Sequence, residues 1–212
     1  MKVFMHKTNN KLLIFTSLSI FIISCSSGKK TLPILGFRDV SPNGDTIYHV
    51  IPDFVFTNQE GQPVSQKTVA GKIYVTDFFF TSCPSICPKM KAQMIRIHDA
   101  FMDNDSLILL SHSIDPVFDS VAVLKDYADR LGIKTAKWHL LTGNKEEIYG
   151  IAEKYLVSVA EDGQAPGGFI HSGHFILVDT QRRIRGYYDG TREEEVNQLM
   201  SDIQVLMNEG KE

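Results

Sequence analysis

The sequence predicts an α/β protein with a central mixed sheet flanked by helices. Two observations support this fold class. Between residues 72 and 155, short and mostly apolar runs typical of buried strands alternate with segments of helical periodicity. Two more strand-like runs and a final helical segment follow them. With 212 residues, 43% of them hydrophobic, the chain is long enough for one well-formed core.

The first elements expected are a hairpin, a strand and a helix. Residues 49–64 hold two strand-like runs around the turn sequence EGQP, which predicts an N-terminal β-hairpin extension. Residues 72–80, KIYVTDFFF, are apolar enough for a strand that is buried on both faces. Apolar residues at helical spacing start directly after Cys83 and predict a helix to about residue 102.

Strands and helices are expected to alternate through the rest of the chain. We expect strands at residues 106–115, 137–143, 171–181 and 183–190. We expect helices at residues 121–131, 144–155 and 191–206. A stretch rich in glycine and proline at residues 161–168 predicts a loop or a hairpin before the third of these strands.

The N-terminal residues resemble a targeting segment. Three lysines precede an apolar stretch of about a dozen residues, which is short for a bilayer span of roughly 20. The stretch ends at Cys25 in a sequence that resembles the lipobox of bacterial lipoproteins, where the cysteine is acylated. We expect a signal peptide at 1–24, a tether and linker at 25–46, and the folded domain at 47–212, in oxidising surroundings outside the cytoplasm. An uncleaved membrane anchor is the alternative.

The charge distribution argues against nucleic acid as a partner. The formal net charge is −3, and removal of the three lysines of the targeting segment would make the rest more acidic. No basic patch with interleaved aromatic residues is visible in the sequence. The simplest role of this charge is solubility.

Cys83 and Cys87 are the leading candidates for chemistry. Residues four apart share a helix face, so both sulfurs are expected at the start of the helix. There, unpaired N–H groups and the helix dipole favour thiolate over thiol. Two thiolates aimed at one point can bind Cu(I) or Zn(II), or can close a disulfide. A disulfide across so short a loop stabilises little, and zinc prefers a fourth ligand that the nearby sequence does not offer.

Asp77 lies in the apolar run, six residues before Cys83. Both this aspartate and the order of the elements resemble the thioredoxin superfamily, although the cysteines are spaced CxxxC rather than CxxC. The resemblance implies that Asp77 is a proton acceptor for the cysteine pair. The alternative is a buried polar group whose hydrogen bonds are satisfied.

Three motifs occur in order along the chain: FFFTSCPSICPKM, SIDPVFDS and HSGHFILVD. Together they resemble the Sco/SenC family, the copper proteins of cytochrome c oxidase assembly, over residues 50–209. This resemblance implies a thioredoxin-like fold. One position departs from the family pattern, because the acidic residue that often precedes the histidine is Ile170 here.

The resemblance implies a copper site made of Cys83, Cys87 and His171. Cu(I) favours soft thiolates, and imidazole also suits Cu(II). A site with three protein ligands can release its ion, whereas a closed four-ligand site cannot. We therefore expect a lipid-anchored copper chaperone in a bacterial cell envelope, facing the periplasm. Its expected partners are the copper A-bearing subunit of cytochrome c oxidase, which receives the copper, and a thioredoxin-like reductant that keeps the thiols free.

Two other functions fit the same residues. The first is a thiol–disulfide oxidoreductase that reduces cysteines of the oxidase subunit, or a peroxidase-like enzyme. In either, one cysteine attacks, the other resolves, and His171 positions the thiolate. The second is a copper or redox sensor that signals through a partner.

Further candidate ligands have simpler interpretations. If the strand at 171–181 is extended from its start, His174 faces away from His171. Asp115 and Asp119 have a spacing that suits a metal, but we interpret them as the cap of the next helix. Met90, which has helical spacing with other apolar residues, is expected in the core.

Overall fold

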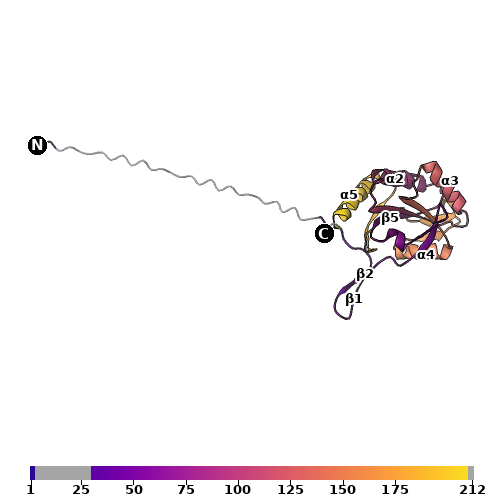
Figure 1. The fold of residues 1–212 in the computed structure, drawn as a ribbon, viewed down its shortest axis with the longest axis horizontal. Helices are drawn as coiled ribbons and strands as arrows, with labels where there is room; N and C mark the ends of the chain where they lie inside the picture. The colour runs from indigo at the N-terminus through magenta and orange to yellow at the C-terminus, as the bar shows by residue number, and fades with distance from the viewer. Residues whose placement is uncertain (3–29, 210–212) are drawn as a thin grey trace.

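A seven-stranded mixed sheet forms the centre of the molecule, as a computed structural model of residues 1–2 and 30–209 shows (Figure 1). Its strands lie in the order β11-β10-β5-β6-β7-β3-β4. Their bounds are β3 Val55–Asn58, β4 Pro63–Ser65, β5 Ile73–Phe79, β6 Leu107–Ser113, β7 Trp138–Thr142, β10 His174–Val178 and β11 Ile184–Asp189. β5, β6 and β7 are parallel, and the other pairings are antiparallel. The predicted fold class is confirmed.

Helices cover both faces of this sheet. Their bounds are α1 Gln66–Val69, α2 Cys87–Ala100, α3 Val121–Leu131, α4 Lys145–Lys154 and α5 Glu193–Glu209. In Figure 1, α2, α3 and α5 lie along one face and α4 lies on the other. The two crossovers from β5 to β6 and from β6 to β7 move in one direction across the sheet. Right-handed crossovers of this kind place both helices on the same face.

Two small two-stranded sheets complete the fold. The hairpin of β1 (Arg38–Val40) and β2 (Thr46–Tyr48) projects from the domain, as Figure 1 shows. β8 (Val159–Glu161) pairs with β9 (Phe169–His171), and the 3-10 turn η1 (Pro166–Gly168) lies between them. The hairpin predicted at residues 49–64 is present as β3 and β4. It extends the central sheet at one edge, because β3 also pairs with β7.

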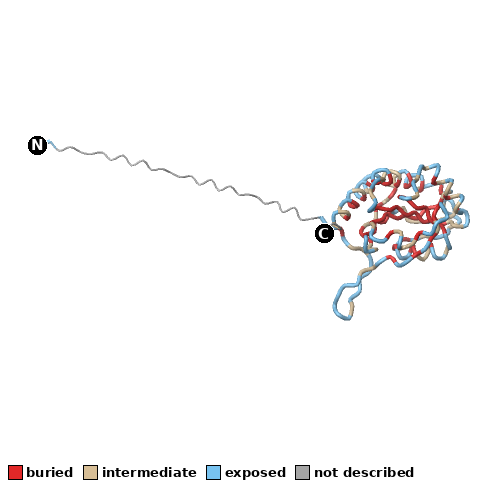
Figure 2. The backbone as a smooth tube through the Cα atoms, viewed as in Figure 1, coloured by how far each residue is buried: buried red, intermediate tan, exposed pale blue. Residues whose placement is uncertain are grey.

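The core lies around the central strands. Every residue of β5 and β6 is buried, which matches their apolar sequences, and Figure 2 shows these strands as the buried centre of the domain. The apolar face of α2 packs onto them through Met90, Met94 and Ile97, as the helical spacing predicted.

The sheet has two poles, defined by the ends of its parallel strands. Phe79 and Ser113 are register partners at the carboxyl ends of β5 and β6, and the cysteine loop begins just after Phe79. Because β10 runs antiparallel to β5, its first residues lie at this same pole. The topology therefore brings the cysteine loop and the segment before His174 to one end of the molecule.

The chain from residue 30 onward packs against the opposite pole. Leu32 is buried, and Arg185 donates hydrogen bonds to the carbonyl oxygens of Leu32 and Pro33 at 2.6 and 2.9 Å. Residues 30–46 were expected to be tether and linker, but they contain this packed segment and all of β1. The expected signal peptide and Cys25 lie outside the described residues, apart from residues 1–2.

Candidate metal centre

Cys83, Cys87 and His171 come together at the first pole of the sheet. Their ligand atoms, the two sulfurs and an imidazole nitrogen, all lie within 4.8 Å of one another. The His171 Nε2 atom is 3.4 Å from the Cys87 Sγ atom. This convergence joins residues that are 84 positions apart in the sequence.

The cysteine loop differs from the predicted helix start. α2 begins at Cys87, so Cys83 lies in the preceding loop and not on the helix. The prediction that both sulfurs share a helix face is therefore wrong. The sulfurs still converge, because the loop turns: the Cys83 N–H donates to the Phe80 carbonyl at 3.3 Å. Pro84 and Pro88 flank this turn, and a proline near a helix start is well tolerated because its missing N–H has no partner there.

His171 is held in the orientation that a metal ligand needs. It is the last residue of β9, and its Nδ1 atom lies 3.1 Å from the Ser172 carbonyl oxygen. A carbonyl oxygen only accepts hydrogen bonds, so Nδ1 carries the proton and the lone pair of Nε2 points at the cysteines. Many metal-binding histidines are oriented in this way by a hydrogen bond from the second ring nitrogen.

The two thiols differ in acidity. Burial raises the pKa of Cys87 to about 12, and its hydrogen bond with Cys83 acts in the same direction. Burial also opposes ionisation of Cys83, but hydrogen bonds from the Cys87 thiol and from the backbone of Ser85 and Cys87 outweigh it and lower the pKa of Cys83. The helix start was expected to favour thiolate in both residues. Only the pKa of Cys83 is lowered, and the cause is hydrogen bonding in the loop rather than a place on the helix.

The donor set fits a soft metal ion. Two sulfurs and one neutral imidazole nitrogen are suitable ligands for Cu(I), and the imidazole also suits Cu(II). Burial lowers the pKa of His171, which favours the neutral ring that binds metal. Cys83 is 8% exposed and Cys87 is 2% exposed, while His171 is half-buried.

Asp77 lies below this centre and is fully buried. Its carboxylate accepts a hydrogen bond from the Lys91 ammonium at 3.1 Å and another from the Ser111 hydroxyl. Lys91 Nζ also lies 3.8 Å from the centre of the Phe79 ring. Among the described residues, the Asp77 carboxylate has no hydrogen bond to either thiol. Its role as a proton acceptor stays a prediction.

The sequence reasoning missed Lys91. The sequence did contain an indication that Lys91 is buried. Lys91 lies four positions after Cys87, three before Met94 and seven before His98, and this helical spacing places it on the buried face of α2. A lysine at such a position indicates a buried acidic partner, since unpaired buried charges are costly.

Asp119 is not a helix cap, contrary to the prediction. The cap of α3 is Ser120, whose side chain accepts from the Val123 N–H at 3.4 Å. The fully buried Asp119 carboxylate instead accepts hydrogen bonds from the N–H and the hydroxyl of Thr81 and from the Ser113 hydroxyl. Burial raises the pKa of Asp119. This aspartate therefore ties the end of β6 to the segment that leads into Cys83.

His174 is separate from the centre, but not for the predicted reason. Residues 172–173 belong to neither strand, so His171 ends β9 and His174 begins β10. His174 is exposed, and its Nδ1 atom lies 3.2 Å from the Ser172 hydroxyl.

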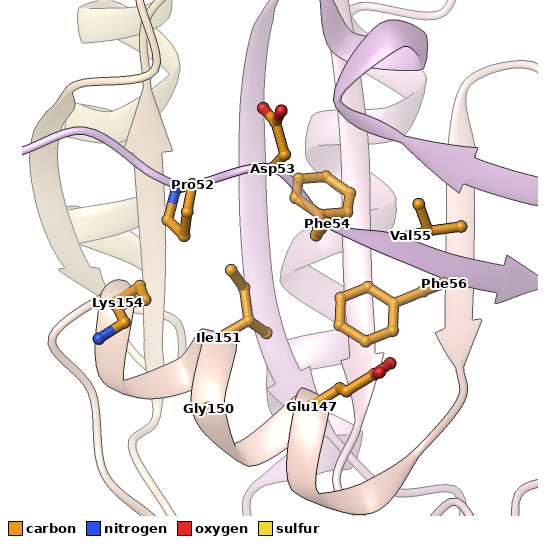
Figure 3. A pocket seen from close by; sticks show the side chains of 9 residues that line it. All are labelled: Pro52, Asp53, Phe54, Val55, Phe56, Glu147, Gly150, Ile151 and Lys154. Carbon is orange, nitrogen blue, oxygen red and sulfur yellow. The ribbon is translucent and has the colours of Figure 1, made fainter.

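A hollow of about 500 Å³ lies away from the metal centre, between β3 and α4. Figure 3 shows Phe54 and Phe56 on one side of it and Ile151 on the other, with charged side chains near its margin. None of the candidate ligands lines this hollow.

Comparison with known proteins identifies the relatives of this chain. The family model of SCO1/SenC proteins matches residues 43–208. A SCO1 protein homolog of Bacillus subtilis (strain 168) is 27% identical over 186 residues, which are 87% of this chain and 91% of that relative. A SCO2-like protein of Rickettsia felis is 29% identical and covers 70% of this chain and 74% of its own length.

Solved structures agree with this assignment. A SCO1/SenC family lipoprotein from Bacillus anthracis has a TM-score of 0.69 at 29% identity, covering 74% of this chain and 95% of its own. BsSco, described as a member of the Sco family of cytochrome c oxidase assembly proteins with a disulfide switch, has a TM-score of 0.66 at 28% identity, covering 74% and 93%. ScoI of Bradyrhizobium japonicum, solved with copper bound, shares the fold with a TM-score of 0.62 at 23% identity, covering 74% and 99%.

The family match extends over most of the domain and includes all three motifs of the sequence analysis. The thioredoxin-like arrangement of the sheet agrees with that of the solved relatives. This chain therefore belongs to the SCO1/SenC family.

Proposed function

We propose that this protein is a copper metallochaperone that delivers copper to the copper A centre during cytochrome c oxidase assembly. The observation that carries the proposal is the convergence of Cys83, Cys87 and His171 within 4.8 Å. Copper-bound relatives and the family's place in oxidase assembly support the choice of ion and of recipient. With only three protein ligands, the ion can be passed on by ligand exchange.

We further propose that the protein is anchored by a lipid on Cys25 and faces the periplasm. A lipoprotein among its structural relatives supports this anchor. Across residues 1–2 and 30–209, no helix is long and apolar enough to cross a membrane. Copper binding requires free thiols in an oxidising compartment, so a thioredoxin-like reductant is part of the proposal.

Metal analysis of the reduced domain tests the copper site. We expect one copper ion per chain, with tight binding lost in Cys83→Ser and Cys87→Ser and weakened in His171→Ala. The matched control is His174→Ala, because His174 is close in sequence but outside the centre. Copper affinity and spectra that do not change in His171→Ala would show that His171 is not a ligand.

A thiol–disulfide oxidoreductase is the second candidate function, and the acidity difference favours it. Cys83 has the lowered pKa of an attacking thiolate, while Cys87 is buried beside it as a resolving thiol. Attack of the Cys83 thiolate on a substrate disulfide would form a mixed disulfide and release one substrate thiol. Cys87 would then displace the second thiol and leave the Cys83–Cys87 disulfide. Efficient turnover with a disulfide substrate that is indifferent to His171→Ala would favour this enzyme over the chaperone.

A further inference from the structure

One aromatic side chain joins the two segments that supply the ligands. The Phe80 carbonyl accepts from the Cys83 N–H at 3.3 Å, so the backbone of this residue holds the cysteine loop. The Phe80 ring, which is 1% exposed, packs against the rings of Phe169 and His171 with centroid distances of 5.0 and 6.0 Å. Phe80 is therefore in contact with both the cysteine loop and the histidine segment.

Gly167 lies directly against this ring. A Cβ atom at position 167 would lie 2.7 Å from Phe80 Cε2 and 3.1 Å from Pro84 Cδ. Carbon atoms that are not bonded do not approach to 2.7 Å, so any side chain here would push the two segments apart. Gly167 also has a φ of +82°, which other residues adopt only with strain.

A shift at Gly167 would be carried to His171. The 3-10 turn containing Gly167 leads straight into β9, whose last residue is His171. β9 is paired with β8 through Phe169 opposite Glu161 and His171 opposite Val159, which makes the segment a short ribbon. Displacement of the β8–β9 ribbon would move the His171 imidazole away from the sulfurs of Cys83 and Cys87.

We propose that Gly167 is a positioning residue of the metal centre. Because glycine has no side chain, the β8–β9 ribbon can pack directly against Phe80. This contact sets the distance between the His171 imidazole and the two sulfurs. The inference rests on the proposed copper site, and it adds two residues, Gly167 and Phe80, that do not touch the ion.

Three glycines of the same loop provide a matched test by alanine substitution. Gly167→Ala adds both the close contact and backbone strain. Gly168→Ala adds strain alone, because its φ is +86° and no atom lies within 4 Å of the new Cβ. Gly163→Ala adds neither, since its φ is outside the left-handed range and no atom lies within 4 Å.

We expect Gly167→Ala to weaken Cu(II) affinity by about 10- to 100-fold, the usual range for residues that orient a ligand. Affinity is measured by competition with a chromophoric chelator. Gly163→Ala should match the wild type, and Gly168→Ala should lose less than Gly167→Ala. Equal losses in Gly167→Ala and Gly168→Ala would overturn the inference, because strain rather than the contact with Phe80 would then explain them.

Spectroscopy separates positioning from general loss of structure. In Gly167→Ala we expect the nitrogen coupling of the Cu(II) electron paramagnetic resonance spectrum to weaken while the sulfur-to-copper charge-transfer band remains. A retained nitrogen coupling would contradict the inference. A variant that merely folds poorly would lose both signals together, and circular dichroism of the copper-free protein checks its fold.

A double-mutant cycle tests the contact itself. Phe80→Leu removes the two ring atoms that the alanine Cβ would meet, so it should partly rescue Gly167→Ala. The affinity loss of the double variant should be smaller than the two single losses combined, and additive losses would overturn the inference. If His171→Ala leaves copper binding unchanged, the proposed site itself fails. If His171→Ala weakens binding and Gly167→Ala does not, only the role of Gly167 fails.

Discussion

Lys91 pairs with Asp77 across 3.1 Å beneath the metal centre, where the side chains are 3% and 0% exposed. The pair links α2, which begins at Cys87, to β5, which leads into the cysteine loop. Ser111 of β6 donates to Asp77, and the Trp138 indole N–H donates to the Ser111 hydroxyl at 2.9 Å. This polar network connects the helix that carries Cys87 with three neighbouring strands.

Lys91→Met is expected to destabilise the domain by about 3–5 kcal/mol, because it leaves the Asp77 carboxylate buried without a counter-ion. Urea unfolding followed by circular dichroism measures the loss. The double variant Asp77→Asn with Lys91→Met should be more stable than Lys91→Met alone, since no buried charge remains. A Lys91→Met protein as stable as the wild type would contradict the energetic importance of the pair.

Asp77→Asn tests the predicted proton transfer. If Asp77 accepts protons from the cysteine pair, the substitution should slow thiol–disulfide exchange by at least about tenfold. The measurement is the exchange rate with a small disulfide as a function of pH. An identical rate–pH profile in wild type and variant would leave Asp77 as a partner of Lys91 only, with no part in exchange.

The strand and helix order could be predicted because apolar periodicity is local. The buried runs of β5 and β6 and the stripe of Met90, Met94 and Ile97 lie where the sequence placed them. The start of α2 was predicted too early because the CxxxC spacing fits a turn as well as the first turn of a helix. A single sequence does not distinguish these two structures when a proline follows each cysteine.

For the candidate site, the sequence predicted the three candidate ligands but not the residues that support them. Cys83, Cys87 and His171 were named from the family motifs, and they meet in space. The contacts that hold these three residues in place could not be predicted. Asp119 accepts a hydrogen bond from Thr81 across 38 residues of sequence, and Gly167 lies against Phe80 across a longer separation. Such contacts depend on how the strands pair, which periodicity does not specify.

The two thiols should be alkylated at very different rates. Since the pKa of Cys87 is about 12 and that of Cys83 is lowered, thiolate at pH 8 is concentrated on Cys83. Iodoacetamide at this pH, followed by peptide mass spectrometry, should label Cys83 at least about 100-fold faster than Cys87. In urea the two rates should become similar. Equal labelling of the folded protein would contradict the difference in acidity.

Arg185 should control whether residues 32–35 stay packed against the domain. Its guanidinium donates to the carbonyls of Leu32 and Pro33 and to the carboxylates of Asp179 and Glu209. Arg185→Lys keeps the charge but cannot reproduce this fork, so we expect the free energy of unfolding to fall by about 2 kcal/mol.

Hydrogen exchange measures the local effect of Arg185→Lys. Protection of residues 32–35 should drop, including the Leu35 N–H that donates to the Ile184 carbonyl at 2.8 Å. The control is Arg192→Lys at an exposed ion pair with Glu195, which should change neither stability nor exchange. Unchanged protection in Arg185→Lys would show that the hydrogen bonds of the guanidinium are not what holds this segment.

His112 should make the domain sensitive to mild acid. Its ring is fully buried and stacks on Phe78 at 5.1 Å, and among the described residues neither ring nitrogen has a hydrogen-bond partner. Burial lowers its pKa from 6.5 to about 3. As the pH falls below 6.5, the unfolded chain takes up this proton while the folded protein does not. Folding stability therefore decreases, by about 2 kcal/mol at pH 5 from this residue alone.

His112→Phe removes this sensitivity while keeping an aromatic ring between Phe78 and Phe56. The stability of the variant relative to wild type, measured by urea unfolding at pH 8, 6 and 5, should rise as the pH falls. His139, whose pKa burial lowers to about 4, leaves part of the acid sensitivity in place. The matched control changes His174, which is exposed, to Phe in the same way, and it should leave the pH dependence as it is. A His112→Phe curve parallel to that of the wild type would mean that the core admits the protonated ring.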